Sequence, residues 1–171
     1  MSAVIEGHHD DHHHGPAKGI TRWLYTTNHK DIGSLYLWFS FIMLFIGGAM
    51  AMVIRAELFE PGSQIVSPEF YNQMVTNHGL IMVFGVIMPA FVGLANWLIP
   101  MQIGAPDMAL PRLNNLSFWI LPAAFGVLLA TFFMEGGAPN FGWTFYAPLS
   151  TEYAPPTVTY FIFAVHIMGA S

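Results

Sequence analysis

The sequence predicts an all-α membrane protein, a polytopic bundle of transmembrane helices, on three observations. Of its 171 residues, 54% are hydrophobic and 9% are charged, whereas a soluble domain carries about 25% charged residues. Apolar runs recur that are long enough to cross a bilayer, and the first, Gly33–Ile54, contains no charged residue. Polar connections with proline and glycine separate these runs.

Composition also excludes several classes of function. Lysine and arginine total five and the formal net charge is −5, so the sequence does not indicate nucleic-acid binding. The chain has no cysteine, which excludes disulfides, iron–sulfur clusters and thiolate chemistry. Any metal or cofactor must therefore be held by histidine, carboxylate, methionine or backbone groups.

Residues 1–19 are polar and contain the run GHHDDHHHG. They lack an apolar central region and so do not resemble a cleavable signal peptide. We expect a disordered cytoplasmic tail. The alternative is a weak affinity for divalent metal ions, because histidine-rich tracts bind such ions.

The apolar runs define the expected helices. They cover about residues 33–54, 78–99 and 116–134, with a fourth over 157–171. Thr76 and Asn77 are expected to be N-cap residues of the second helix, and Pro89 inside it predicts a kink. The fourth run reaches Ser171 with no terminating signal, so we expect the chain to be part of a longer protein.

Basic residues predict the orientation in the membrane. Four lie on the N-terminal side or in the second connection: Lys18, Arg22, Lys30 and Arg112. The opposite side has only Arg55. The positive-inside rule therefore places the N-terminus in the cytoplasm, together with the turn that carries Asp107.

This topology predicts two polar clusters at opposite ends of the bundle. Arg55 ends the first helix and His78 begins the second, so we expect both at similar depth on the outer side. Trp143 and Tyr146 belong to an outer loop. The inner end is expected to gather acidic and hydrogen-bonding residues: Asn28, Tyr36, Asn96, Asp107, Asn114 and Ser117.

Each cluster has a functional and a purely structural interpretation. His78 can bind haem iron, or it can be an ordinary interfacial residue, which spacing alone favours. Arg55 can donate to a porphyrin substituent or extend its side chain to the interface. Asp107 can admit protons to a water chain or stabilise a helix N-terminus. For His166, a hydrogen bond to a neighbouring helix is favoured over a ligand role.

Five segments carry a resemblance to a known family: RWLYTTNHKDIGSLY, IRAELFEPGSQ, NHGLIMVFGVIMP, NWLIPMQIGAPDMALPRLNNLSFWILP and GWTFYAPLS. Together they resemble the opening third of subunit I of haem–copper cytochrome c oxidases, over roughly residues 20–171. The histidine-rich N-terminus is more similar to bacterial members than to mitochondrial ones. The resemblance implies that residues 20–171 hold the first three helices, and the start of the fourth, of a twelve-helix subunit.

The resemblance also implies roles for individual residues. His78 corresponds to one axial ligand of the low-spin haem a, and Arg55 to the arginine that hydrogen-bonds the haem formyl group. Trp143 and Tyr146 correspond to the haem environment on the loop side. Asp107 corresponds to the mouth of the D proton pathway. The residues that order water along this pathway are implied to be Asn96, Asn114, Tyr36, Ser117 and Ser171.

A structural Ca²⁺ or Na⁺ site is implied near the outer end of the first helix. Its expected ligands are Glu57, Glu60 through its carbonyl, Gly62 and Gln64, oxygen donors that suit a hard cation. No copper ligand is expected anywhere in residues 1–171. The second haem a and the copper are implied to be bound by residues further along the subunit.

The implied function is that of the catalytic subunit of cytochrome c oxidase, which reduces oxygen to water with electrons from cytochrome c and pumps protons in aerobic respiration. This part alone is expected to be inactive. Expected partners are the copper-bearing subunit II, subunit III, cytochrome c and the lipid bilayer. The expected location is the bacterial inner membrane, or the mitochondrial inner membrane if the source is eukaryotic. A quinol-oxidising relative is the close alternative; a non-enzymatic haem protein and a passive channel are more remote ones.

Overall fold

The computed structural model describes residues 19–171, in which every regular element is a helix. In chain order these are α1 (Ile20–Tyr25), α2 (His29–Glu57), α3 (Pro68–Leu80), the π-helix η1 (Ile81–Ile87), α4 (Met88–Ile103), α5 (Pro111–Ala130), the 3₁₀ turn η2 (Thr131–Phe133) and α6 (Val158–Ala170). The predicted all-α class is confirmed for this part of the chain. The expectations for the tail concern residues 1–19, of which 1–18 lie outside the described residues.

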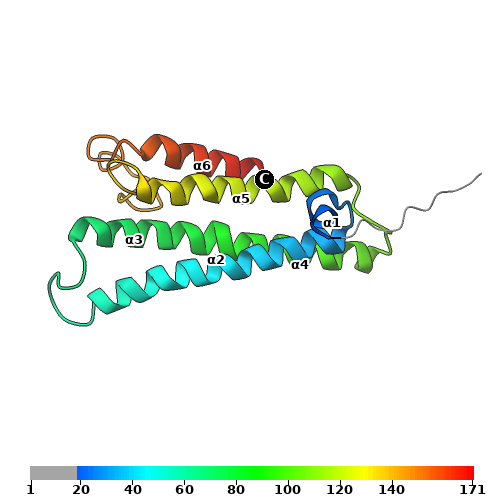
Figure 1. Cartoon of the computed structure of the whole chain (residues 1–171), viewed down its shortest axis with the longest axis horizontal. Coiled ribbons are helices and arrows are strands. Elements are labelled where there is room, and N and C mark those ends of the chain that lie inside the picture. Colours follow the sequence, from blue (N-terminus) through cyan, green and yellow to red (C-terminus); the bar gives the residue numbers. More distant parts are fainter. Residues whose placement is uncertain (1–18) are drawn as a thin grey trace, which may run out of the picture.

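Within the described part of the chain, three helical rods are long and apolar enough to cross a membrane: His29–Glu57, Pro68–Ile103 and Pro111–Phe133. α2 packs along the rod formed by α3, η1 and α4, while α5 packs on α6 and also contacts α2. Figure 1 shows the rods lying lengthwise, with the loops 58–67 and 134–157 at one end. α1 and the turn 104–110 lie at the other end. We call these the Glu57 end and the Asp107 end.

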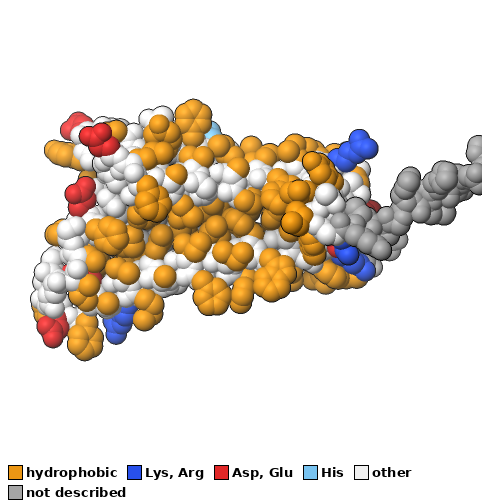
Figure 2. Space-filling model, in the orientation of Figure 1, with side chains coloured by type: hydrophobic (Ala, Val, Ile, Leu, Met, Phe, Trp, Pro, Cys, Tyr) orange, Lys and Arg blue, Asp and Glu red, His pale blue; other side chains and the backbone are white. Residues whose placement is uncertain are grey.

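Charged side chains are concentrated at these two ends, and hydrophobic side chains cover the visible face between them (Figure 2). Large apolar residues in this band face outward; Phe45 of α2 is 65% exposed and Phe91 of α4 is 68% exposed. Such a surface is stable against lipid or further helices rather than water. The arrangement is that of a membrane bundle.

The second spanning rod begins earlier than the sequence predicts, and the N-cap expectation for Thr76 and Asn77 is wrong. Ser67 is the N-cap, its hydroxyl oxygen accepts a backbone N–H, and Pro68 opens α3. Thr76 and Asn77 lie well inside α3, where their side chains donate to carbonyls one turn back. They are 1% and 0% exposed. The Thr76 hydroxyl and the Asn77 amide N–H thus find acceptors within the helix, which makes this polar segment compatible with a continuous helix.

Next to Pro89, where the sequence predicts a kink, the structure has a π-helix. η1 occupies Ile81–Ile87, directly before α4. Proline has no N–H and cannot close the usual hydrogen bond to the preceding turn. Ser40 of α2 donates to the carbonyl of Val86, within η1, at 2.8 Å. π segments inside α-helices are frequent at functional sites.

Glycines allow α2 to approach the neighbouring rod closely. A Cβ on Gly33 would lie 2.8 Å from the carbonyl oxygen of Gly93, and a Cβ on Gly93 would lie 2.9 Å from that of Gly33. A Cβ on Gly47 would lie 2.8 Å from the sulfur of Met82. Small residues at such crossings let membrane helices pack backbone to backbone.

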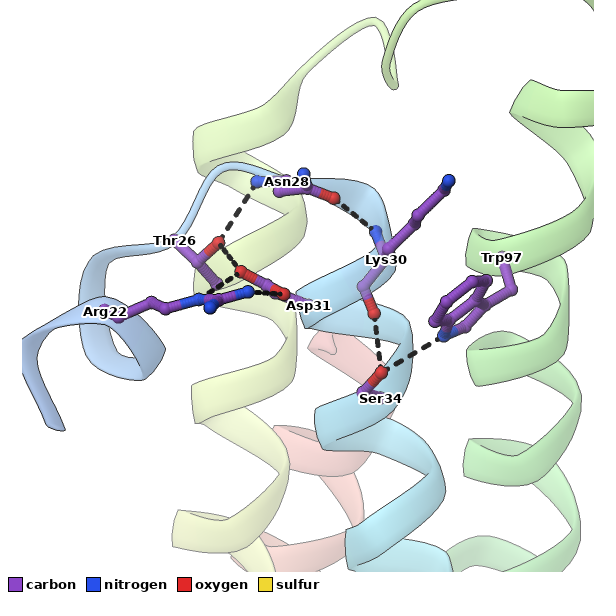
Figure 3. A network of polar contacts seen from close by, with 7 residues as sticks. All are labelled: Arg22, Thr26, Asn28, Lys30, Asp31, Ser34 and Trp97. Carbon is purple, nitrogen blue, oxygen red and sulfur yellow. Dashed lines mark hydrogen bonds and ion pairs between the residues drawn. The ribbon is translucent and has the colours of Figure 1, made fainter. Parts of the chain in front are cut away.

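A small polar network ties α1 to the start of α2 (Figure 3). Arg22 forms a bidentate pair with Asp31, at 2.7 and 3.1 Å, and Thr26 donates to the same carboxylate. The hydrogen bond with Asp31 raises the pKa of Arg22. Asn28 caps α2 by accepting the backbone N–H of Lys30 at 2.8 Å. α1 is thereby held at the Asp107 end.

Candidate functional site

At the Asp107 end, side chains from three helices and the connecting turn form one hydrogen-bonded group. The backbone N–H groups of His29 and Met108 donate to Asp107 Oδ1, at 3.2 and 2.7 Å. The Nδ1 atom of His29 lies 2.7 Å from the carbonyl oxygen of Asn96. Asn114 donates from Nδ2 to Oδ1 of Asn96 at 2.6 Å. The half-buried Asp107 is thus linked to α2 directly, and through α2 to α4 and α5.

A second group begins one turn further along α5. Ser117 Oγ lies 2.8 Å from the hydroxyl of Tyr36, which is 2% exposed. Ser117 also donates to the carbonyl of Ser171, and Ser171 Oγ donates back to the carbonyl of Ser117 at 2.7 Å. The structure therefore brings all the residues predicted for the proton pathway into these two groups: Asp107, Asn96, Asn114, Tyr36, Ser117 and Ser171.

Sequence reasoning did not single out His29, which joins the first group. The residue is 6% exposed, and its ring and backbone both take part. His29 is the first residue of α2 after the N-cap Asn28. The first N–H groups of a helix have no partner within it, so that of His29 is available to Asp107. In the sequence, the position of His29 directly after the N-cap residue Asn28 is the signal that could have identified it as a partner of Asp107.

His78 lies within the bundle, against α2. Its Nδ1 atom is 2.9 Å from the carbonyl oxygen of Gly47. A carbonyl oxygen can only accept, so Nδ1 must carry the proton and donate it. In the neutral ring this leaves Nε2 with a free lone pair, the arrangement found in histidines that bind metals.

The expectation that Arg55 and His78 share one depth is wrong. His78 is level with Gly47, and Gly47 and Arg55 are separated by eight residues along α2. This corresponds to about 12 Å at 1.5 Å per residue. The reason is the early start of α3, which places His78 near the end of α3 instead of at its first turn. Arg55 is exposed and, among residues 19–171, forms no ion pair.

Trp143 and Tyr146 have different surroundings. Trp143 packs over α3 at Gly79, the residue after His78: a Cβ on Gly79 would lie 3.4 Å from the Cδ1 atom of Trp143. Thr76 holds this loop by accepting the backbone N–H of Gly142 at 3.0 Å. Tyr146 is 75% exposed. Trp143 is therefore brought to the helix that carries His78, whereas the Tyr146 side chain faces outward.

At the opposite end, Glu57 organises the loop 58–67. Its carboxylate accepts the backbone N–H groups of Gln64, Ile65 and Val66, at distances from 2.8 to 3.0 Å. The side chain is 5% exposed. Three charge-assisted hydrogen bonds to one carboxylate pin the loop to the end of α2.

The cation expected at this loop stays a prediction, and the donor set fits it poorly. A carboxylate has about four acceptor positions, and three of those on Glu57 are taken. Gln64 donates its amide to the carbonyl of Pro61 at 3.0 Å, and Glu60 is exposed. Gly62 adopts a positive φ of 105°. Within the described residues, no three histidine or carboxylate side chains converge as a metal site.

His166 contacts its own helix. Its Nδ1 atom lies 2.8 Å from the carbonyl oxygen of Ile162, one turn back on α6. Among residues 19–171 this is the contact that the ring makes, and the expected hydrogen bond to a neighbouring helix is not found there. The residue is exposed, because the face of α6 that carries it is not the face that packs on α5.

Comparisons with known proteins agree with the resemblance. The family model described as Cytochrome C and Quinol oxidase polypeptide I matches residues 31–171. Cytochrome c oxidase subunit 1 of Corynebacterium diphtheriae is 47% identical over 146 residues, which cover 84% of this chain and 26% of the relative. The probable cytochrome c oxidase subunit 1-alpha of Streptomyces avermitilis is 48% identical over 145 residues, 84% of this chain and 25% of the relative. A heme-copper oxidase subunit I+III from Aeropyrum pernix is 48% identical over 139 residues, 81% of this chain and 17% of the relative.

The chain spans about a quarter of the length of the first two of these relatives. The family match and the identities confirm the resemblance read from the sequence. Three helices able to cross a bilayer, in a family of oxidase subunits, make this a membrane protein. The chain belongs to the family of cytochrome c and quinol oxidase polypeptide I.

Proposed function

We propose that the chain is part of the catalytic subunit of a haem–copper oxidase that reduces oxygen to water with electrons from cytochrome c and pumps protons. Family membership supports oxidoreductase activity in a respiratory membrane complex. The relatives named as cytochrome c oxidases favour cytochrome c as the electron donor. A quinol oxidase is the second candidate, because the family description covers both donors.

The observation that carries this proposal is the 2.9 Å contact between His78 Nδ1 and the carbonyl oxygen of Gly47. Donation from Nδ1 to Gly47 orients the ring and leaves Nε2 for iron. We assign His78 as an axial ligand of haem a, which supplies one-electron transfer when it is bound. Arg55, without an ion-pair partner in the described residues, is the proposed donor to the haem formyl group. Trp143 is proposed to border the haem on the loop side, while Tyr146 is a more distant part of that environment.

Two hydrogen-bonded groups support a proton pathway, one at the Asp107 end and one further into the bundle. Asp107 is the proposed entrance. Hydroxyl and amide groups follow it along the bundle, and such groups can order chains of water. A small cavity of about 80 Å³ adjoins Tyr36 and Ser171 and is otherwise lined by apolar side chains. We propose that protons pass from Asp107 along Asn96 and Asn114, and then Tyr36, Ser117 and Ser171, toward the oxygen-reducing centre.

The remaining assignments rest on the family and the charge distribution. The second haem a and the copper are proposed to be held by other parts of the subunit. Subunit II with its copper, subunit III and cytochrome c are the proposed partners; the Aeropyrum relative, named subunit I+III, supports the association with subunit III. Arg22 belongs to α1, Lys30 to the first turn of α2 and Arg112 to the first turn of α5. These basic residues thus lie at the Asp107 end, which favours a cytoplasmic N-terminus in a bacterial inner membrane.

Substitution of His78 in the full-length oxidase tests the proposal. His78→Ala is expected to abolish the low-spin haem a absorption, because the iron loses one of its axial ligands. His166→Ala is the matched control, since His166 is exposed and bonds to its own helix, and it is expected to leave the spectrum unchanged. A wild-type low-spin spectrum in His78→Ala, in a correctly assembled enzyme, contradicts the assignment.

A further inference from the structure

The contacts between α2 and the neighbouring rod reveal a mismatch of one residue. Three contacts align the two antiparallel helices: His78 with Gly47, Val86 with Ser40, and Gly93 with Gly33. On α2 the contacting residues are seven apart, twice in succession. On the other rod the first interval, His78 to Val86, is eight residues and the second, Val86 to Gly93, is seven.

Seven residues make about two turns of an α-helix, so two packed helices stay aligned when both advance by seven. The extra residue lies between His78 and Val86, an interval that includes all of η1 except Ile87. A π segment accommodates one additional residue within a helix. η1 thus accommodates the extra residue. As a result, the contact of His78 with Gly47 and the contact of Gly93 with Gly33 can form on the same face of α2.

Ser40 is placed to hold this arrangement. Its side chain is 6% exposed, and its hydroxyl donates to the carbonyl of Val86 at 2.8 Å, near the end of η1. If η1 reverted to an α-helix, α3 would rotate by about 100° and shift by about 1.5 Å relative to α4. The imidazole of His78 would then leave the carbonyl of Gly47.

We propose that Ser40 is a positioning residue that stabilises the π-helix Ile81–Ile87 in register with α2 and thereby sets the His78 imidazole against Gly47. This inference rests on the proposed role of His78 as a haem ligand. Its geometric part, the register of η1 against α2, is independent of that role.

The test uses the full-length oxidase with Ser40→Ala and Ser40→Thr. Ser34→Ala is the matched control, because Ser34 lies on α2 and bonds to Lys30 and Trp97 instead of η1. Two quantities are measured: amide hydrogen exchange over residues 81–92, and the low-spin haem signal in electron paramagnetic resonance. Ser40→Ala is expected to accelerate the exchange and to shift the signal at unchanged haem content. Ser40→Thr, which keeps the hydroxyl, is expected to restore both, and Ser34→Ala to change neither.

Wild-type exchange and a wild-type signal in Ser40→Ala overturn the proposal. Faster exchange with an unmoved haem signal overturns the positioning role, since it leaves Ser40 as a purely structural contact. Two single-residue deletions test the register separately. Removal of Val83 eliminates the extra residue, so low-spin haem is expected to be preserved. Removal of Leu94 displaces Asn96 from His29, so assembly is expected to be impaired.

Loss of haem in both deletions contradicts the register. The His78→Ala spectrum separates these outcomes from failure of the proposed function. An unchanged spectrum in His78→Ala rejects the ligand assignment, while the exchange measurements still decide whether Ser40 holds η1.

Discussion

The two ends of the bundle use buried polar side chains in different ways. At the Asp107 end and in the adjoining part of the bundle, side chains from different helices also bond to one another, as Asn96 does with Asn114 and Tyr36 with Ser117, in addition to the backbone contacts of Asp107 and His29. At the Glu57 end, side chains bond to the backbone of loops, as Glu57 does with three consecutive N–H groups. Backbone partners are fixed in number and direction, so they fasten a loop. Hydroxyl and amide side chains can exchange partners with water, as a proton path requires.

The largest effect is expected from Asp107→Asn at the first of these ends. The amide cannot take up and release a proton, so proton-coupled turnover of the full-length enzyme in vesicles should fall, on the order of 10²-fold. Haem content and thermal stability should stay near the wild-type values, because the amide oxygen can still accept from His29 and Met108. A normal rate with normal pumping would reduce Asp107 to a structural hydrogen-bond acceptor.

A smaller loss of turnover is expected from His29→Ala, which sharpens the comparison within the Asp107 end. The backbone N–H to Asp107 remains, but the ring contact with the carbonyl of Asn96 is lost. Steady-state turnover and proton uptake are measured for both His29→Ala and Asp107→Asn, and the losses in the two variants are compared. Thr27→Ala, an exposed residue before the same helix, is the control. An effect as large as that of Asp107→Asn would make His29 a proton carrier instead of a link.

Glu57→Gln should affect stability and leave the proton path intact. The neutral amide weakens three hydrogen bonds to Gln64, Ile65 and Val66, so the thermal unfolding temperature should fall and amide exchange over 58–67 should rise. Glu60→Gln, exposed in the same loop, is the control and should change neither. Chelation of divalent cations should have less effect than Glu57→Gln. If chelation alone loosens the loop to the same extent, a cation is essential there.

Arg55→Met should shift the haem a absorption to the blue without loss of haem, because the proposed donor to the formyl group is removed. Optical spectra of the reduced enzyme measure this shift. Lys30→Met, a basic residue at the other end of the same helix, should leave the band in place. An unmoved band in Arg55→Met removes the formyl bond from the proposal and leaves Arg55 as an interfacial residue.

The smallest effect is expected from Arg22→Ala. Its ion pair with Asp31 is on the surface, where such pairs contribute little to stability. The thermal unfolding temperature should stay within a few degrees of wild type, and turnover should not change. A marked loss of turnover would connect α1 to the function of the Asp107 end, which nothing in the network of Figure 3 requires.

The sequence alone was sufficient to predict the helical membrane class, the three spanning rods within residues 19–171 and the polar residues that gather near the Asp107 end. Long uncharged runs such as Gly33–Ile54 leave few alternatives, because lipid accepts only segments that satisfy their own backbone hydrogen bonds. The family followed from continuous segments such as IGAPDMALPRLNNLSFW. Such signals are local, and each is complete within one stretch of chain.

The tertiary structure decided what depends on two helices at once. Composition placed Thr76 and Asn77 outside the second helix, but contacts with the loop 134–157 bury them within it. The depth of His78, its tautomer and the participation of His29 each depend on a carbonyl or carboxylate contributed by another segment. Pro89 marks the position of η1 in the sequence, but the match of η1 to α2 along one face depends on both helices. No single stretch of sequence contains that requirement, since it arises from the packing of α2 against the rod that returns beside it.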